Sequence, residues 1–419
     1  MSDHYLIFLL GLIACFLSLL MTPLVIQLAH LKGWIVAPRK DRWHTKPTAL
    51  MGGIAIFLSF ITLIFVASVF FSIDWLVIIA FFIMFITGLV DDLVELKPIY
   101  KLVAQVLATL FIIFKGYVFG AGQLGVLGIP ITFLFVIGIT NAINLLDNMD
   151  GLSSGVSAIV AIMSGALAMQ VENIPVALIA FLIAGSTLGF LYFNFNPAKI
   201  FMGDCGSLFL GFALSFLAIS VQKSIGSHSV YIILILPLSI LALPILDTSL
   251  VTLKRLLSGR KIYMGGKDHT SHRLVALGLT EKKAVMILYG VSLLWGISAV
   301  LLIRSHNSSL YLPTIAVLLV LTAFFGLFLG RVRVYNESEE KLAYLRMKGQ
   351  YMQKGGVLLR FLLMNKKVIF GVSFDILIVS TAYYFSGVIL DLDLRKTYLF
   401  LAVMIAIKIF LFFIFNSYR

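Results

Sequence analysis

The stretch IPITFLFVIGITNAINLLDNMDG, residues 129–151, joins a long apolar run to a strongly polar end. Its apolar part approaches the ~20 residues that an α-helix needs to cross a bilayer. Comparable runs recur along the chain, and the polar residues again gather at their ends. The sequence therefore predicts an all-α fold, a polytopic bundle of membrane-spanning helices.

The composition supports the same class. Of the 419 residues, 61% are hydrophobic and 12% charged, and the mean hydropathy is +1.06. Soluble domains contain about 45–50% apolar and about 25% charged residues, so a soluble, disordered or nucleic-acid-binding chain is excluded. The strands of a membrane β-barrel have about ten residues, and the runs here are roughly twice as long. Two cysteines, Cys15 and Cys205, cannot build a disulfide framework.

Thirteen apolar runs are predicted to span the membrane, eleven in a core and two at the C-terminal end. They are 5–31, 49–70, 75–90, 99–114, 129–147, 153–170, 174–192, 206–222, 230–253, 284–303, 310–330, 367–388 and 397–416. We do not expect the first run to be a cleaved signal peptide, because Asp3 and His4 stand where a basic leader belongs.

The distribution of Lys and Arg predicts the orientation. Most of them fall in the connections 32–48, 91–101, 193–206, 254–283 and 331–367. Positively charged loops stay in the cytoplasm, so the N-terminus is predicted to lie outside. The opposite loops contain only Lys115, Lys223, Arg304, Arg395 and Lys396. The formal net charge of +13 therefore reflects topology, together with attraction for anionic headgroups and phosphate substrates.

Three domains are predicted. Residues 1–330 form a transmembrane core with cytoplasmic active-site loops. Residues 331–366 are basic, and they form either an amphipathic helix on the inner leaflet or a solvated linker. Residues 367–419 form a transmembrane hairpin.

The first two cytoplasmic connections carry candidate phosphate ligands. Lys46 and its basic neighbours in KGWIVAPRKDRWHTKPTALMGG suit a phosphate, although cations beside a membrane are also the ordinary topology signal. Asp91 and Asp92 end an apolar run, and Lys101 follows one turn into the next helix. Carboxylates with phosphate oxygens are the usual environment of Mg²⁺. A solvated helix end explains the acidic pair equally well.

The third connection, NAINLLDNMDG, spaces Asn141, Asn144, Asp147 and Asp150 three residues apart. This spacing predicts that they share one helical face. Such a face is too polar to meet lipid, which favours a ligand site over an interhelical hydrogen-bond ladder.

The last two connections are FNFNPAKIFMGDCGSL and the basic loop that ends in DHTSHR. Asp204 precedes a predicted helix, where an Asp either binds a metal or caps the helix. Phe201 could stack on a base or simply pack. His269 and His272 lack a third soft ligand for zinc, so together with Arg273 they are better suited to a pyrophosphate.

These motifs, in this order and on one side of the membrane, resemble those of the polyprenyl-phosphate N-acetylhexosamine-1-phosphate transferases, which are glycosyltransferase family 4-like enzymes. The resemblance covers roughly residues 1–330. It implies that a UDP-N-acetylhexosamine and a polyprenyl phosphate give a polyprenyl-diphospho-sugar and UMP. Mg²⁺ is the implied cofactor, with Mn²⁺ as a substitute.

The resemblance also implies residue roles. Asp204 would be the principal metal ligand, with Asn144 beside it. Asp91 and Asp92 would orient or deprotonate the lipid phosphate. Asp147 and Asp150 would line the nucleotide pocket, and Phe201 would stack on the base. The phosphates or the sugar would be contacted by Lys46, Lys101, His269, His272 and Arg273.

At two places the sequence departs from motifs found in the family, and both departures bear on which branch the chain resembles. The motif DHTSHR has two separated histidines rather than a run of three, and the first loop lacks the GTPTMGG wording of the phospho-MurNAc-pentapeptide transferases. Both favour the undecaprenyl-phosphate GlcNAc-1-phosphate branch, which starts lipid-linked cell-surface glycans from the cytoplasmic face of a bacterial inner membrane. The alternatives are a phospho-MurNAc-pentapeptide transferase or, in another class, a nucleotide-sugar or lipid transporter. No nucleic-acid partner is expected, and a homodimer is left open.

Overall fold

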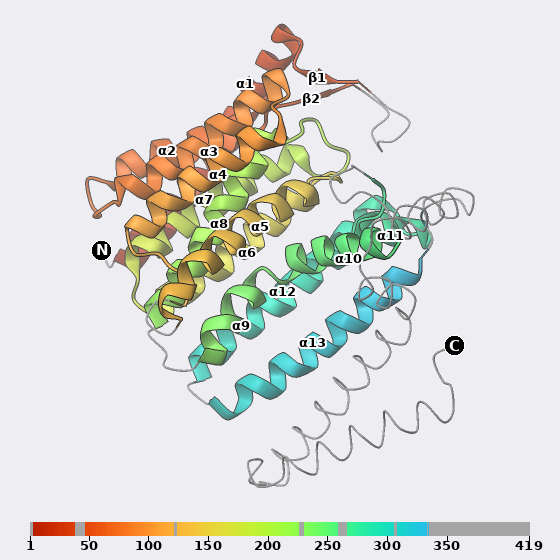
Figure 1. The fold of residues 1–419 in the computed structure, drawn as a ribbon. Coiled ribbons are helices and arrows are strands. Elements are labelled where there is room, and N and C mark those ends of the chain that lie inside the picture. The colour runs from red at the N-terminus through yellow and green to blue at the C-terminus, as the bar shows by residue number, and fades with distance from the viewer. Residues whose placement is uncertain are drawn as a thin grey trace, which may run out of the picture. The chain divides into compact units, whose positions relative to one another are not determined.

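The computed structural model describes residues 3–37, 47–120, 124–225, 230–258, 266–305, 308–332 and 334. The described chain is almost entirely helical (Figure 1). The helices are α1 Asp3–Lys32, α2 Gly53–Ala67, α3 Trp75–Val94, α4 Pro98–Phe114, α5 Gly128–Leu146, α6 Leu152–Gln170, α7 Ile174–Asn194, α8 Gly203–Ile225, α9 Val230–Ile240, α10 Ala242–Ser258, α11 Thr270–Ala276, α12 Glu281–Ser305 and α13 Ser308–Arg331. A 3₁₀ turn, η1 Gly125–Leu127, precedes α5, and β1 Ile35–Val36 pairs antiparallel with β2 Thr48–Ala49.

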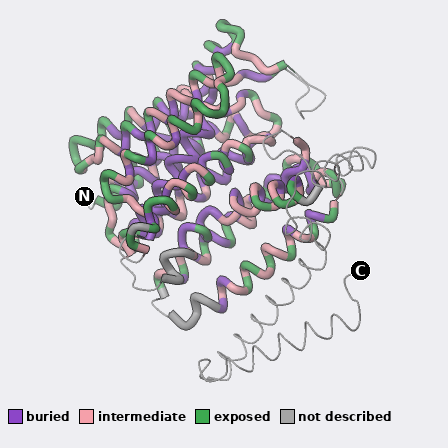
Figure 2. Tube along the Cα trace, viewed as in Figure 1, coloured by how far each residue is buried: buried purple, intermediate pink, exposed green. Residues whose placement is uncertain are grey.

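The chain divides into two compact units. The first comprises Met1–Thr248 and Gly278–Arg304, and the second comprises Ser249–Leu277 and the residues from Ser305 onward. In the first unit α8 is the central helix, packed by α2, α3, α5 and α6 and buried along nearly its whole length (Figure 2). The helix α7 lies between α1 and α6.

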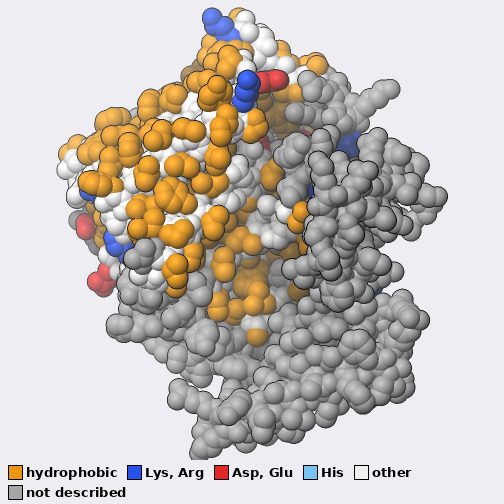
Figure 3. All heavy atoms as spheres, viewed as in Figure 1, with side chains coloured by type: hydrophobic (Ala, Val, Ile, Leu, Met, Phe, Trp, Pro, Cys, Tyr) orange, Lys and Arg blue, Asp and Glu red, His pale blue; other side chains and the backbone are white. Residues whose placement is uncertain are grey.

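The predicted membrane class is confirmed. Among the described residues, eight helices are long and apolar enough to cross a bilayer, and α2 and α4 are shorter apolar helices. In Figure 3, hydrophobic side chains cover most of the visible described surface, and charged side chains lie mainly toward its margins. Leu12, Phe114 and Leu134 are 69%, 84% and 75% exposed, as lipid-facing residues are. The protein is a multi-pass helical membrane protein.

Each predicted core span except one coincides with a single helix. The run 230–253 was predicted as one helix and is two, α9 and α10, with a turn at Leu241. The break has a local cause, because Pro244 has no N–H to offer the carbonyl of Ile240. The predicted spans 367–388 and 397–416 and the basic segment 331–366 lie outside the described residues, apart from the end of α13, Val332 and residue 334.

A short backbone ladder places the segment before α8. Ala49 forms a parallel bridge with Ile200, and the Phe201 N–H donates to the Ala49 carbonyl at 2.8 Å. The Gly52 and Gly53 N–H groups donate to the carbonyls of Phe201 and Met202 at 2.9 and 2.8 Å. The loop between α1 and α2 therefore fixes the chain that leads into Asp204.

The α1–α7 contact depends on glycine. A Cβ on Gly185 would overlap the Gly11 carbonyl oxygen, and one on Gly189 would overlap that of Cys15. Small residues at such positions let helix backbones approach closely in membranes. Gly138 on α5 makes a matched control, since a Cβ there meets nothing within 4 Å.

We predict that Gly185→Val lowers the melting temperature in detergent, because overpacking a tight contact typically costs about 1–3 kcal/mol. Gly138→Val carries the same β-branched side chain in a helix and should change the melting temperature little. The two temperatures are compared by the loss of monodisperse protein after heating. Equal values for the two variants would show that the α1–α7 contact tolerates the side chain.

Candidate active site

Asp91, in the last turn of α3, anchors the turn between α3 and α4. The N–H of Glu95 donates to the Asp91 carbonyl at 2.9 Å, and the N–H of Leu96 donates to Asp91 Oδ1 at 2.7 Å. Glu95 has a positive φ of 51°, which ends α3 and redirects the chain. Pro98 then opens α4, where its missing N–H costs nothing. The sharp turn brings Lys101 back over Asp91.

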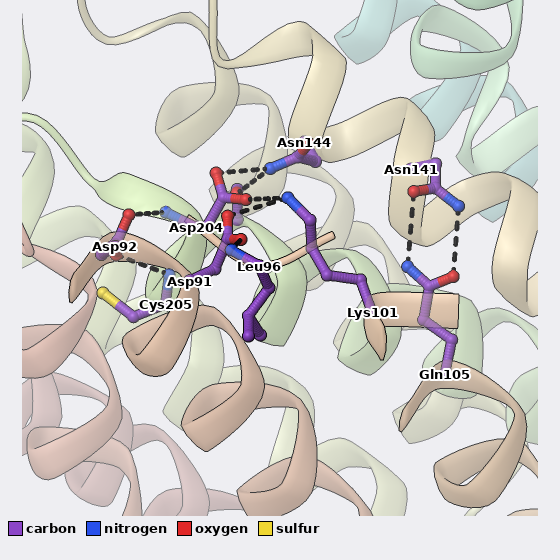
Figure 4. Close-up of polar contacts among 10 residues, drawn as sticks. Asp91, Asp92, Leu96, Lys101, Gln105, Asn141, Asn144, Asp204 and Cys205 are labelled. Atoms are coloured by element: carbon purple, nitrogen blue, oxygen red, sulfur yellow. Dashed lines mark hydrogen bonds and ion pairs between the residues drawn. The ribbon is translucent and has the colours of Figure 1, made fainter. Parts of the chain in front are cut away.

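Lys101 joins two carboxylates from distant parts of the sequence. Its Nζ lies 2.8 Å from Asp91 Oδ2 and 2.9 Å from Asp204 Oδ2 (Figure 4). Asn144 Nδ2 donates to Asp204 Oδ1 at 3.0 Å and to Ser207 Oγ at 2.8 Å. We call Asp91, Lys101, Asn144 and Asp204 the acid–lysine cluster. It draws one side chain from each of α3, α4, α5 and α8.

The acid–lysine cluster is accessible to solutes. The side chains of Lys101 and Asp204 are 25% and 26% exposed, and that of Asp91 is 12% exposed. With both acids ionised, the two carboxylates and the one ammonium leave a formal charge of −1. A site with this charge favours a further cation and, through Lys101, a phosphate oxygen.

Asp92 points away from Lys101 although it neighbours Asp91. Its Oδ1 accepts the N–H of Asp204 at 2.8 Å, and its Oδ2 accepts the N–H of Cys205 at 3.0 Å. These groups belong to the first turn of α8, whose N–H groups have no partner within the helix. Gly203, at φ 76°, lies against this carboxylate: a Cβ there would be 2.5 Å from Asp92 Oδ2. The two neighbouring acids therefore have different surroundings.

The polar residues of the third connection do not share one helical face, so that prediction is wrong for Asp147 and Asp150. The helix α5 ends at Leu146, because the chain turns at Asp147 (φ −77°, ψ 47°) before α6 begins. Asn144 joins the acid–lysine cluster. Asn141 instead exchanges two hydrogen bonds of 3.3 Å with Gln105 on α4.

Asp150 lies with the segment that follows α7. Its Oδ2 accepts the Ala198 N–H at 2.9 Å and Asn196 Nδ2 at 3.3 Å. Asn196 Nδ2 also donates to Glu281 Oε2, at 3.0 Å, on α12. Asn194 is held by Ser154 and by the Ile200 carbonyl, at 2.6 and 2.9 Å. The asparagines of FNFNP thus fix the path of the chain toward Phe201 and Asp204, and Asp150 binds this segment through Asn196 and Ala198.

The motif DHTSHR lies in the second unit and is buried there. Arg255 grips Asp268 through Nε and Nη2, at 2.8 and 2.6 Å. Burial alone would raise the pKa of Asp268, but the hydrogen bonds and charge of Arg255 outweigh it and hold this pKa below its usual value. Arg273 donates to the carbonyls of Asp268, Leu329 and Val332 at 2.8, 3.3 and 2.8 Å.

The histidines of this motif lie close together, with ring centroids 6.3 Å apart. A role of His269, His272 and Arg273 toward a pyrophosphate stays a prediction, as does base stacking by the half-buried Phe201. Lys46 lies outside the described residues. Two polar partners in the first unit were not predicted from the sequence, Ser207 and Gln105. Each follows a predicted residue by one helical turn, Asp204 and Lys101 respectively, and this spacing was the available signal.

The acid–lysine cluster fits a divalent cation. Among the described residues, no three or more His, Cys, Asp or Glu side chains are grouped to hold a metal. Mg²⁺ in phosphoryl-transfer sites, however, commonly takes one or two carboxylates and completes its ligands with water and substrate phosphates. Asp91 Oδ2 and Asp204 Oδ2 already converge on one cation, the Lys101 ammonium. This oxygen-only donor set suits Mg²⁺ or Mn²⁺ rather than zinc.

The chain is similar in sequence to known proteins. Residues 74–222 match Glycosyl transferase family 4. A probable undecaprenyl-phosphate N-acetylglucosaminyl 1-phosphate transferase from Bacillus subtilis (strain 168) is 33% identical over 295 residues, which are 68% of this chain and 81% of the relative. A decaprenyl-phosphate N-acetylglucosaminephosphotransferase from Mycobacterium leprae (strain TN) is 31% identical over 317 residues, which are 67% and 80%. A phospho-N-acetylmuramoyl-pentapeptide-transferase from Chlorobium limicola is 30% identical over 332 residues, which are 66% and 86%.

The multi-pass fold and these matches define an integral-membrane phosphotransferase. The chain belongs to glycosyl transferase family 4. The resemblance that its polar motifs predict is therefore confirmed. The matched segment 74–222 contains every member of the acid–lysine cluster.

Proposed function

We propose that the protein transfers N-acetylglucosamine 1-phosphate from UDP-N-acetylglucosamine to a polyprenyl phosphate, releasing UMP. The observation that carries the proposal is the convergence of Asp91, Lys101, Asn144 and Asp204 inside the segment matched by the family. Relatives described as acting with undecaprenyl and decaprenyl phosphates support a polyprenyl acceptor. An undecaprenyl acceptor, and a product that starts a lipid-linked surface glycan, belong to this proposal.

The reaction exchanges one phosphoryl bond for another. An oxygen of the lipid phosphate bonds to the phosphorus that bears the sugar. The bond from this phosphorus to the bridging oxygen breaks, and UMP leaves with the electron pair. A phosphate monoester with a second pKa near 6 is mostly dianionic at about pH 7. Charge neutralisation and in-line positioning therefore matter more than a strong base.

The acid–lysine cluster supplies both requirements. Lys101 donates to a phosphate oxygen, and Asp91 and Asp204 hold the ammonium between them. Asn144 orients Asp204 through its 3.0 Å hydrogen bond. Asp204 and Asp91 would hold Mg²⁺, which when bound neutralises the negative charge of the diphosphate. A rival scheme, a covalent intermediate on Asp91 or Asp92, predicts a burst of UMP in the absence of lipid.

The test uses the full-length protein purified in detergent. Undecaprenyl phosphate and Mg²⁺ are combined with UDP-N-acetylglucosamine, with UDP-MurNAc-pentapeptide or with UDP-glucose, and the lipid product is identified by mass spectrometry. Of the three UDP-sugars, we expect only UDP-N-acetylglucosamine to give the lipid product, together with a stoichiometric amount of UMP. Transfer of phospho-MurNAc-pentapeptide would instead establish the alternative branch. A transporter would release no UMP in this assay and would instead move the UDP-sugar across the membrane when the protein is reconstituted in vesicles.

A cytoplasmic active site is part of the proposal. It rests on the Lys and Arg distribution, which predicts Lys97 on the inside and Glu172 on the outside. Both side chains are exposed at helix ends. A membrane-impermeant maleimide applied to intact cells should label Glu172→Cys and spare Lys97→Cys, and the reverse pattern would invert the topology.

Phe201 is proposed to stack on the uracil base. Stacking of a base on an aromatic side chain contributes about 1–3 kcal/mol. This binding is expected to be the same in ground and transition states, so Phe201→Ala should raise KM for the UDP-sugar by about 5- to 150-fold with little change in kcat. Phe193→Ala, which removes a similarly half-buried ring from α7, is the control. An unchanged KM in Phe201→Ala would leave Phe201 as a packing residue.

A further inference from the structure

Asp92 joins α3 to the first turn of α8 through two hydrogen bonds. One carboxylate oxygen accepts the Asp204 N–H and the other accepts the Cys205 N–H, at 2.8 and 3.0 Å. A carboxylate at a helix N-terminus satisfies N–H groups that lack intrahelical partners, and it interacts favourably with the helix dipole. Here the carboxylate comes from another helix. It therefore both caps α8 and fastens α8 to α3.

The surrounding packing leaves little freedom at this point. A Cβ on Gly88 of α3 would overlap the Asp204 backbone, and one on Gly53 of α2 would overlap Gly206. The start of α8 is thus held against two neighbouring helix backbones. Within this packing, the two hydrogen bonds of Asp92 fix the rotation of the first turn of α8.

The orientation of the first turn of α8 about the helix axis determines where the Asp204 side chain points. Asp204 is bonded to Asp92 through its backbone N–H and to Lys101 and Asn144 through its carboxylate. Figure 4 shows Asp92 on the far side of Asp204 from the Lys101 ammonium. The Asp92 carboxylate therefore acts on the backbone that carries Asp204, while Asp91 shares Lys101 with it directly.

We propose that Asp92 is a positioning residue, which caps α8 so that the Asp204 carboxylate meets Lys101 and Asn144, and which does not itself touch the phosphates. The proposal rests on the proposed function for the importance of Asp204. It departs from the expectation that the two acids act together on the lipid phosphate. The two acids therefore have different roles: Asp91 faces the reacting groups, and Asp92 binds the backbone N–H groups at the start of α8.

Two substitutions separate a cap from a base or nucleophile. Asp92→Asn retains one acceptor oxygen and the shape of the side chain, whereas Asp92→Ala retains neither. A cap should lose function in steps, so we expect kcat to fall about 10-fold in Asp92→Asn and about 100-fold or more in Asp92→Ala. A base or nucleophile would make the two variants equally inactive, because neither an amide nor a methyl side chain can act as a carboxylate base or form an acyl phosphate.

The chain offers a second readout that does not depend on activity. Cys205 is fully buried, and its N–H is one of the two that Asp92 holds. In a Cys15→Ser background Cys205 is the only thiol in the sequence. We expect N-ethylmaleimide to label Cys205 faster in Asp92→Ala than in the parent, with Asp92→Asn between them. Asp91→Asn is the matched control and should leave the labelling rate unchanged.

The KM values distinguish a positioning role from a general loss of structure. Rates are normalised to monodisperse protein, and KM for the UDP-sugar should stay within about twofold in both Asp92 variants while kcat falls. Equal inactivity of Asp92→Asn and Asp92→Ala with parental Cys205 labelling would overturn the proposal. Unchanged kcat with faster labelling would also overturn it, since α8 would then be capped by Asp92 with no consequence for Asp204. If the protein transfers no sugar phosphate at all, the labelling series still tests the cap.

Discussion

Asp204→Asn is expected to abolish measurable transfer, a loss of about 10³-fold or more, on the scale of removing a principal electrostatic group from an active site. The Asp204 carboxylate accepts from two donors, Lys101 Nζ at 2.9 Å and Asn144 Nδ2 at 3.0 Å. An asparagine has one acceptor oxygen, so its own NH₂ must face one of these donors. The substitution removes a negative charge and also leaves a polar group opposed by a like group.

The measurement is initial UMP release at saturating substrates over a range of Mg²⁺ concentrations. Asp74→Asn is the matched control, because Asp74 is also an acid at a helix start with a lysine partner, Lys115 at 3.2 Å. This control should retain turnover within about twofold, since an exposed ion pair contributes little. Turnover near that of the parent in Asp204→Asn, at the same Mg²⁺ concentration, would remove Asp204 from the proposed mechanism.

Much of the helical framework could be predicted because the bilayer imposes a simple rule. An apolar run of sufficient length becomes a helix, and so the predicted core spans from 5–31 to 206–222 each match a single helix. The exception at 230–253 depends on one residue. Pro244 removes a single backbone donor, which breaks the helix without changing the hydropathy of the run.

The side-chain pairings could not be predicted in the same way. Sequence spacing indicated that Asp91, Lys101, Asn144 and Asp204 were polar residues at helix ends, but spacing says nothing about which ends meet. Asp91 and Asp204 share Lys101 only because α3 and α8 pack together in the fold. The pattern NAINLLDNMDG gave a wrong prediction of a shared helical face for a related reason. Its period of three was extended past Leu146, where the helix ends.

The different roles of the adjacent residues Asp91 and Asp92 also could not be predicted from the sequence. Asp91 and Asp92 are chemically identical and adjacent, yet they point to different partners because successive residues on a helix are about 100° apart. One meets a side-chain ammonium and the other meets two backbone N–H groups. A glycine at position 203, against the Asp92 carboxylate, was the only local sign of the second arrangement.

Lys101→Met is expected to lower kcat by about 10²- to 10³-fold while the protein stays folded, comparable to the loss of one charged donor to a transition state. Methionine keeps much of the length of the side chain, and the site loses chiefly the ammonium. Two carboxylates, of Asp91 and Asp204, then face each other without their shared cation. A phosphate oxygen also loses its donor. Lys101→Arg keeps the charge with a different geometry and should fall between methionine and the parent.

A double-mutant cycle identifies the origin of this loss. Asp91→Asn removes one of the two partners of Lys101, so the part of its effect that comes from this contact should disappear when Lys101 is already methionine. We expect a coupling of about 0.5–3 kcal/mol in kcat/KM, the range found for residues in direct contact. Lys115→Met, combined with Asp91→Asn, is the control cycle and should be additive, because the partner of Lys115 is Asp74. Additivity in the Lys101 cycle would mean that Asp91 and Lys101 act on the reaction separately, and their 2.8 Å contact would then be a feature of the resting protein that the transfer does not use.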